Sequence, residues 1–341
     1  MRNFRLTHTQ RLANWIGDAN LQQIVDSSKD FYARIPILNT PISMFAYKGE
    51  VYDSLPNMGF FSSLFATGFS SLDDLISERT AGGKGQNIFF AKTGTLAVLG
   101  SHGSLWNVGP NPGAGGTPAA IAAGANPVNT TTGGLQQADP SGADTTHVTT
   151  AYAQGTSAPN NLLLYDRLWH GSAVQHNTTS AQTISGVVTR YTTTASVGNF
   201  AFLETTTVLG ATVHNITMTY VDNAGNAAEA AAALAAVVSS AVTRLPHANW
   251  FIPLNAADTG LRNITQIQMS AASTGVSNAV VGHPIGYLPC PVANAPFLVD
   301  GINSAFNLEE IKTDACLALL EINKGAATAT TYIGSVLMVS G

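Results

Sequence analysis

Alternation of apolar and polar residues between positions 162 and 225 is the strongest structural signal in the sequence. Ile216, Met218 and Tyr220 alternate with threonines, which is the period-two pattern of a strand with one buried face. Residues 222–225 (Asp-Asn-Ala-Gly) follow, and these residue types bond their own backbone or accept a positive φ. We therefore expect a hairpin turn there and place Ile216, Met218 and Tyr220 in the β core.

Three neighbouring segments also have strand-like composition. Phe200–Leu209 is rich in aromatic and β-branched residues, and Phe202 is expected in the β core. The other two segments are Leu162–Leu168 and the threonine-rich run Gln182–Thr194. Four strands within about sixty residues have the spacing of a β-sandwich or jelly roll. The predicted fold class is therefore mainly β, with an antiparallel β-sandwich or jelly-roll-like region.

The remainder of the C-terminal half contains further strands and two ambiguous segments. Strands are expected at Ile264–Met269, Cys316–Ile322 and Tyr332–Val339. Ala227–Val242 reads either as an alanine-rich helix or as an insertion that ends in a strand, and helix propensity favours the helix. The prolines and glycines of Gly282–Pro296 predict a meandering connection.

Five segments of this region together resemble a known family: LLLYDRLWH (162–170), AQTISGVVTRYT (181–192), FLETTTVLG (202–210), NITMTYVDNAGNA (215–227) and DTGLRNITQIQMSAASTG (258–275). Their succession is similar to that of tailed-phage virion structural proteins, most closely head decoration, or cement, proteins. The resemblance spans roughly Thr145–Gly341. It implies a structural protein of a bacteriophage particle that is made in the host cytoplasm, binds the major capsid protein and lies on the capsid surface. The family usually has a polar, arginine-bearing stretch at 227–236, where this chain is alanine-rich.

Composition divides the chain into three parts. Residues 1–108 form a mixed N-terminal anchoring region, in which the apolar spacing before Pro36 predicts short amphipathic helices and Ser71 with Asp74 predicts a capped helix from Leu72. Residues 109–150 are rich in Gly, Pro, Ala and Thr and read as a flexible linker or extended arm. Residues 151–341 form the β-sandwich region.

An aromatic run stands out in the N-terminal part, where Phe60, Phe61, Leu64, Phe65 and Phe69 fall within ten residues. One interpretation is the core of a small subdomain. The other is an anchor inserted into a neighbouring subunit, because aromatic clusters dominate interface energetics. The second interpretation makes these residues the candidate contact with the capsid.

Low charge is the main compositional feature, since charged residues are 10% of the chain and the formal net charge is −5. A neutral polar surface suits a protein packed against copies of itself, and we expect a homotrimer. The scarcity of clustered lysine and arginine argues against nucleic-acid binding. No apolar run reaches the length of a membrane span, and the start of the chain has no apolar segment typical of a secretory signal.

Catalytic and metal-binding motifs are weak, so no enzyme activity, cofactor or metal is expected. Gly82–Gln86 lacks the phosphate-loop spacing, and the neighbours Ser101, His102 and Ser104 do not follow a nucleophile-elbow pattern. Cys290 and Cys316 read as buried apolar residues, although a composite site with His247 and His283 stays open. Two other functions stay open as well: a tail or fibre-type receptor-binding module, and a β-sandwich hydrolase acting on surface polysaccharide.

Overall fold

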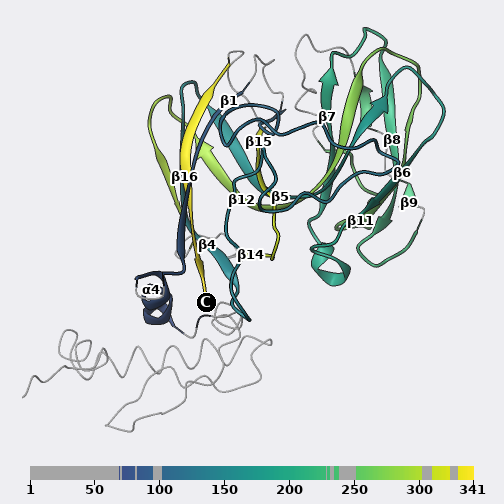
Figure 1. Cartoon of the computed structure of the whole chain (residues 1–341). Coiled ribbons are helices and arrows are strands. Elements are labelled where there is room, and N and C mark those ends of the chain that lie inside the picture. The colour runs from purple at the N-terminus through teal and green to yellow at the C-terminus, as the bar shows by residue number, and fades with distance from the viewer. Residues whose placement is uncertain are drawn as a thin grey trace, which may run out of the picture. The chain divides into compact units, whose positions relative to one another are not determined.

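The structure is a computed structural model that describes residues 69, 71–80, 83–94, 102–227, 229–230, 234–237, 251–301, 309–322 and 329–341 (Figure 1). The chain divides into two compact units, residues 1–70 and 71–341. Of the first unit only Phe69 is described, and its side chain is buried. All elements named below belong to the second unit. None of the described helices is long and apolar enough to cross a membrane.

Helix α4 (Leu72–Thr80) opens the second unit. Its start has the predicted cap, because the Asp74 backbone N–H donates to Ser71 Oγ at 3.1 Å. Asp73 and Asp74 add negative charge to the first turn, where it complements the helix dipole. The predicted helix is confirmed.

The described strands form three sheets. The first has the order β13-β4-β16-β1-β3 with β14 beside β4, the middle sheet β2-β15-β5-β12-β7, and the third β10-β8-β11-β6 with β9 beside β8. A short 3-10 helix, η1 (Thr193–Ser196), precedes β7. The strands are β1 (Gly85–Thr93), β2 (Gly103–Ser104), β3 (Pro110–Asn111), β4 (Thr146–Gly155), β5 (Asn160–Gln175), β6 (Gln182–Val187), β7 (Phe200–Thr207), β8 (His214–Asp222), β9 (Glu229–Ala230), β10 (Leu234–Val237), β11 (Leu261–Met269), β12 (Val276–Cys290), β13 (Phe297–Asp300), β14 (Glu310–Ile311), β15 (Leu317–Ile322) and β16 (Thr331–Ser340).

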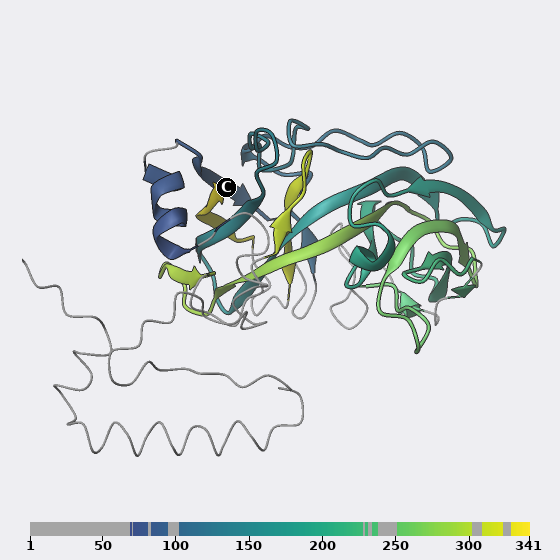
Figure 2. The ribbon, with the colours of Figure 1, turned by 90° about the horizontal axis from the view of Figure 1, so that it is seen from below.

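Two long paired strands, β5 and β12, run through the whole second unit (Figure 2). β15 pairs with the first half of β5, and β7 pairs with the first half of β12. Because β5 and β12 are antiparallel, β15 and β7 lie at opposite ends of the two long strands. The first half of β5 and the second half of β12 face β4 of the first sheet. The other end of the pair faces β6 of the third sheet, where Gly186 lies against the Trp169 ring. The middle sheet therefore takes part in two sandwiches.

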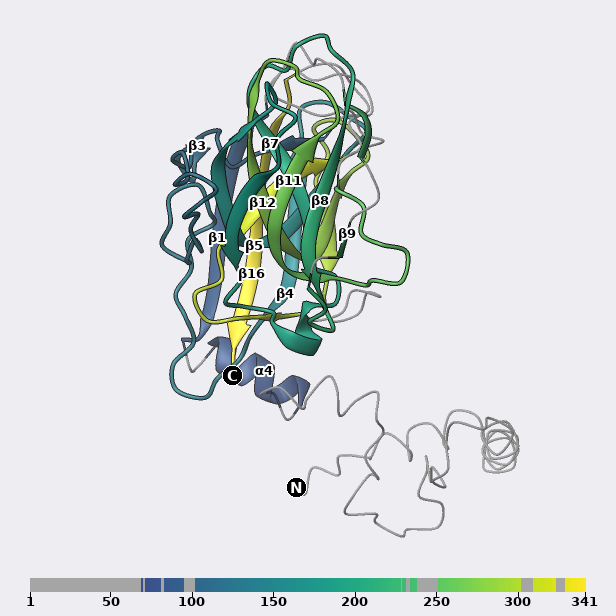
Figure 3. The same ribbon diagram turned by 90° about the vertical axis from the view of Figure 1, so that its right-hand side faces the viewer.

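The predicted fold class is confirmed, because all paired strands are antiparallel and the sheets pack as sandwiches. Figure 3 shows the third sheet in front of the long strands, with α4 at one end of the sheets. Ile216, Met218 and Tyr220, expected in the core, are fully buried on the inner face of β8. Phe202 of β7 is buried as well.

The expected hairpin turn follows β8. Gly225 has a φ of 98°, which a residue without Cβ adopts at little cost, and its N–H donates to Asp222 O at 3.2 Å. Asp222 Oδ1 also accepts the backbone N–H groups of Gly225 and Asn226, at 2.6 and 2.7 Å. The chain then returns through β9, which pairs with β8.

Two sequence interpretations of the β region are wrong. The described part of Ala227–Val242 contains strands β9 and β10, which pair with β8, and not the favoured helix. Gly282–Pro296 is not a meander throughout, because β12 continues through Pro284 and Pro289 to Cys290. β7 pairs with β12 only as far as Gly282, so both prolines lie outside that pairing. Their lack of a backbone N–H therefore does not interrupt the hydrogen bonds between β7 and β12.

The segment 109–150, expected to be a flexible linker, packs along the sheets instead. Ala125 and His170 exchange backbone hydrogen bonds of 2.9 Å, and Leu135 N–H donates to Leu317 O at 2.7 Å. Glycines allow this close approach, since a Cβ on Gly115 would lie 2.2 Å from the Trp106 ring. The predicted domain boundaries themselves stay a prediction.

Candidate functional site

Two charged residues lie in the interior on β5, where Asp166 and Arg167 follow one another inside a leucine-rich strand. Both side chains are fully buried. Successive residues of a strand point to opposite faces, so the two charges cannot neutralise each other and each needs its own partner.

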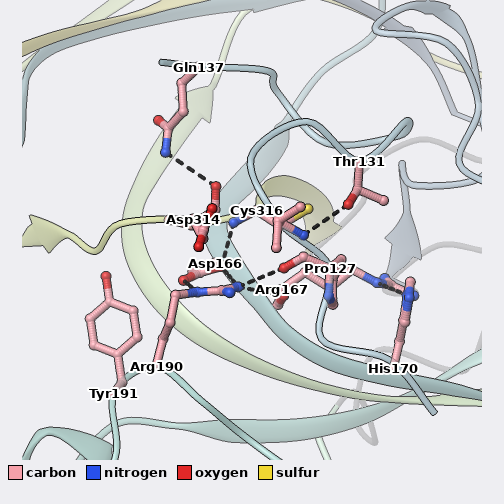
Figure 4. A network of polar contacts seen from close by, with 12 residues as sticks. Pro127, Thr131, Gln137, Asp166, Arg167, His170, Arg190, Tyr191, Asp314 and Cys316 are labelled. Carbon is pink, nitrogen blue, oxygen red and sulfur yellow. Dashed lines mark hydrogen bonds and ion pairs between the residues drawn. The ribbon is translucent and has the colours of Figure 1, made fainter. Parts of the chain in front are cut away.

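Asp166 pairs with Arg190, which lies just beyond β6 (Figure 4). Arg190 Nε and Nη2 donate to the two carboxylate oxygens at 2.8 Å each, which is a bidentate ion pair. Asp166 Oδ1 also accepts the Cys316 backbone N–H at 2.8 Å. Arg190 Nη2 reaches Pro127 O at 3.0 Å and thereby holds the segment 109–150 to β5.

Arg167 pairs with Glu204 of β7 in the same bidentate manner, through contacts of 3.1 and 2.9 Å. Asn278 of β12 donates to Glu204 Oε2 at 2.8 Å. The guanidinium carbon lies 4.4 Å from the centroid of the Trp106 ring, which is a cation–π distance. Arg167 Nε donates to His170 Nδ1 at 2.9 Å, so His170 Nδ1 is the acceptor and carries no proton.

The protonation states follow from these contacts. Burial alone lowers the pKa of Arg167, but the Glu204 carboxylate and the Tyr165 hydroxyl together outweigh burial, and the net pKa is raised. Burial likewise opposes the charge of Glu204, yet Arg167 holds the pKa of this carboxyl below its usual value. Burial and then Arg167 lower the pKa of His170 to about 3. At neutral pH the site therefore contains two ion pairs and a neutral imidazole.

This arrangement is suited to fixing strands and not to chemistry on a substrate. A glycosidase needs two carboxyl groups that face a sugar, whereas Asp166 and Glu204 are each held by an arginine. Burial raises the pKa of the Cys316 thiol to about 12, which keeps the thiol protonated and unreactive. The two ion pairs join β5 to β7 and to the segments at Pro127 and Arg190.

Of the other predicted site residues, Ser104 lies beside the second ion pair, where its side-chain hydrogen bond helps to lower the pKa of Glu204, and several others lie outside the described residues. Phe60, Phe61, Leu64 and Phe65 lie outside the described residues, as do Ser101 and His247. Ser104 Oγ accepts the Trp106 backbone N–H at 3.2 Å. Cys290 is a buried free thiol. Within the described ranges there is no group of three or more His, Cys, Asp or Glu side chains that could hold a metal ion.

Sequence reasoning missed the ion pairs, although one signal was present. Asp166 and Arg167 stand inside LLLYDRLWH, a segment whose apolar density predicts a buried strand. A charge at such a position must be paired. The partners could not be named from the sequence, because Arg190 and Glu204 lie 24 and 37 residues from their partners.

The outer face of the first sheet carries several exposed apolar side chains. Leu298, Tyr152, Ser335 and Phe89 face one another across β13, β4, β16 and β1, and Ile333 lies two residues from Ser335 on the same face. Leu298 is 64% exposed, Phe89 55% and Ile333 37%. The rings of Phe89 and Tyr152 meet edge to face at 6.3 Å between centroids. We call Phe89, Tyr152, Leu298 and Ile333 the apolar face.

No known protein family and no curated protein matches the sequence. Among solved structures, the chain is similar to the VP2 subviral particle of infectious bursal disease virus, with 11% identity, a TM-score of 0.19, and coverage of 83% of this chain and 86% of that chain. The Gt strain of the same virus gives 9% identity, a TM-score of 0.17, and coverage of 75% and 80%. At these TM-scores the likeness does not establish a shared fold.

Proposed function

We propose that this protein is a structural component of a bacteriophage particle, and specifically a decoration protein that binds the lattice of the major capsid protein as a homotrimer. The sequence resemblance to head decoration proteins motivates the phage assignment. The observation that carries the proposal is the apolar face, where exposed aromatic and aliphatic side chains of paired strands lie together. Exposed apolar patches of this kind mark contact surfaces between proteins.

The opposite end of the unit supports this orientation. There the exposed side chains of β6, β8 and β11 are neutral and polar (Thr183, Ser185, Asn215, Thr217 and Gln268), with the single apolar exception of Val187. A surface of hydroxyls and amides remains hydrated without cost, whereas exposed phenyl and leucyl groups gain about 25 cal/mol for each Å² that they bury. We therefore place the apolar face toward the capsid and the third sheet toward solvent.

Attachment through two surfaces is proposed: the apolar face, and the aromatic anchor Phe60, Phe61, Leu64 and Phe65, from which the predicted member Phe69 is left out because its side chain is buried. Each contact alone is modest, since association also costs translational freedom and side-chain order. In a homotrimer the second and third contacts become intramolecular, so the attachment strengthens through effective concentration.

Binding to particles that lack their own copy tests the proposal. The double variant Phe89→Ser and Leu298→Ser is expected to weaken binding at least tenfold, which corresponds to about 1.4 kcal/mol. Val187→Ser is the matched control, because Val187 is 62% exposed on the third sheet, and it is expected to bind like the wild type. Replacement of Phe60, Phe61 and Phe65 by serine tests the anchor separately.

Copy number distinguishes decoration from the tail or fibre alternative. A decoration protein is present in hundreds of copies per particle, and a tail or fibre protein in at most a dozen. If the Phe89→Ser/Leu298→Ser variant binds as well as the wild type, the apolar face is not a capsid contact. A copy number of at most a dozen would mean that the protein is a tail or fibre component and not a decoration protein.

A further inference from the structure

Two buried histidines meet where the third sheet joins the middle sheet. His176 directly follows β5, and His214 is the first residue of β8. Both are buried, with at most 1% of either residue exposed to solvent. His176 Nδ1 lies 2.9 Å from His214 Nε2, and His176 Nε2 lies 2.8 Å from Ser277 Oγ of β12. The pair therefore connects β5, β8 and β12, which belong to two different sheets.

The neighbours of the pair determine where its protons lie. His214 Nδ1 is 3.0 Å from Thr212 O, and a carbonyl only accepts, so His214 carries its proton on Nδ1. His214 Nε2 is then the acceptor for the N–H of His176 Nδ1. His176 Nε2 in turn accepts the Ser277 hydroxyl. All four ring nitrogens have partners when both rings are neutral.

An additional proton disturbs this arrangement at either place where it can bind. On His214 Nε2 it places two N–H groups face to face at 2.9 Å, which breaks the bond between the sheets. On His176 Nε2 it forces Ser277 to become the acceptor and leaves a charge in the interior. A buried charge without a counterion is strongly unfavourable.

Among the described residues around the pair, no carboxylate acts on His176 to compensate such a charge. Ser277 comes from β12, Thr205 of β7 is paired with it, and the preceding loop contributes the Thr212 carbonyl. Residues 273–275, whose backbone bonds to His176, are Ser, Thr and Gly. Within the described residues, His214 is the titratable group that acts on His176, and burial together with His214 lowers the pKa of His176 to about 4.

We propose that His176 and His214 form an acid-released latch, which holds the third sheet to β5 and β12 at neutral pH and opens on acidification. Opening exposes the histidines to water, where they take up protons freely. Protonation of the open state thus drives the equilibrium toward opening as the pH falls. The segments released are those that contact the pair, around Thr212 and around residues 273–277.

Hydrogen exchange of the full-length protein tests the latch without any substitution. The reporters are amides around the pair: His176 N–H, which donates to Gly275 O, and Ser273 N–H, which donates to His176 O. A histidine of pKa about 6.5 in the open state and about 4 in the closed state raises the opening constant roughly 30-fold between about pH 7.5 and pH 5. After correction for intrinsic exchange, the protection of these amides is expected to fall by that factor. The Thr145 and Gly341 amides, which bond each other's carbonyls, are the internal control and are expected to change far less.

Substitution assigns the response to the pair. His176→Gln keeps hydrogen-bonding groups at this position but removes the titratable imidazole of His176. The variant is expected to show a flatter pH response at the reporter amides. His147→Gln is the matched control, because His147 is also a buried histidine but lies in β4, and it is expected to keep the full response. Unchanged protection of the wild-type reporters down to about pH 5 would overturn the latch, as would a full response in His176→Gln. If His176→Gln does not fold, the wild-type measurement decides alone.

Discussion

The Arg167–Glu204 ion pair gives the sharpest test of what holds the long strands together. Glu204→Gln changes the shape of the side chain little but removes the negative charge. The guanidinium of Arg167 then stays buried, with 0% of its side chain exposed and no carboxylate in contact. Removing one partner of a buried pair costs about 3–5 kcal/mol, because the remaining charge is uncompensated. The Trp106 ring 4.4 Å away and the His170 ring nitrogen recover only part of this loss.

Urea denaturation at neutral pH, followed by tryptophan fluorescence, measures this loss. Trp106 packs on Arg167 and reports on the site directly. A loss of 3–5 kcal/mol lowers the melting temperature of a unit this large by roughly 10 °C. We expect the urea concentration at the unfolding midpoint to fall, while the dependence of the unfolding free energy on urea concentration keeps its slope.

A second variant separates the charge effect from packing. In Glu204→Gln combined with Arg167→Met both charges are gone, so most of the lost stability is expected to return. Glu78→Gln is the surface control, since its partner Lys84 is 31% exposed, and it is expected to cost less than about 1 kcal/mol. An uncompensated buried charge is not what destabilises Glu204→Gln if this variant loses no more stability than Glu78→Gln, or if the double variant is less stable than Glu204→Gln alone.

Two further predictions concern backbone strain and a buried lysine. Gly225→Ala is expected to destabilise the second unit by about 1 kcal/mol in urea unfolding, because φ at this turn is 98°, whereas Gly116→Ala, with open space around it and no positive φ, is expected to be neutral. Lys92 is buried and donates to the carbonyls of Val108, Gly113 and Gly133, and burial lowers the pKa of Lys92 to about 8. Between about pH 8 and 10.5 the folded state has lost this proton while the unfolded state still binds it, so wild-type stability is expected to rise over that range. The rise is expected to be smaller in Lys92→Met, and an identical pH profile would contradict the buried charge.

Local patterns in the sequence were sufficient for the elements whose stability depends on near neighbours. The alternation at Ile216, Met218 and Tyr220 predicted which face of β8 is buried, because side-chain direction along a strand has a fixed period. Ser71 predicted the start of α4, since a cap is satisfied within three residues. The turn at residues 222–225 was predictable for the same reason.

Contacts between distant segments decided the rest. Alanines between 227 and 237 prefer a helix in isolation, yet β8 offers a row of backbone partners, and the described residues there form strands. The glycine- and proline-rich segment 109–150 has little apolar surface of its own, but it gains order from the strands and tryptophan rings that it covers. The two ion pairs follow the same rule. The position of Asp166 and Arg167 in a leucine-rich strand predicts that both charges are buried and need partners. Only the folding of β5 against β7 and Arg190 determines that the partners are Arg190 and Glu204.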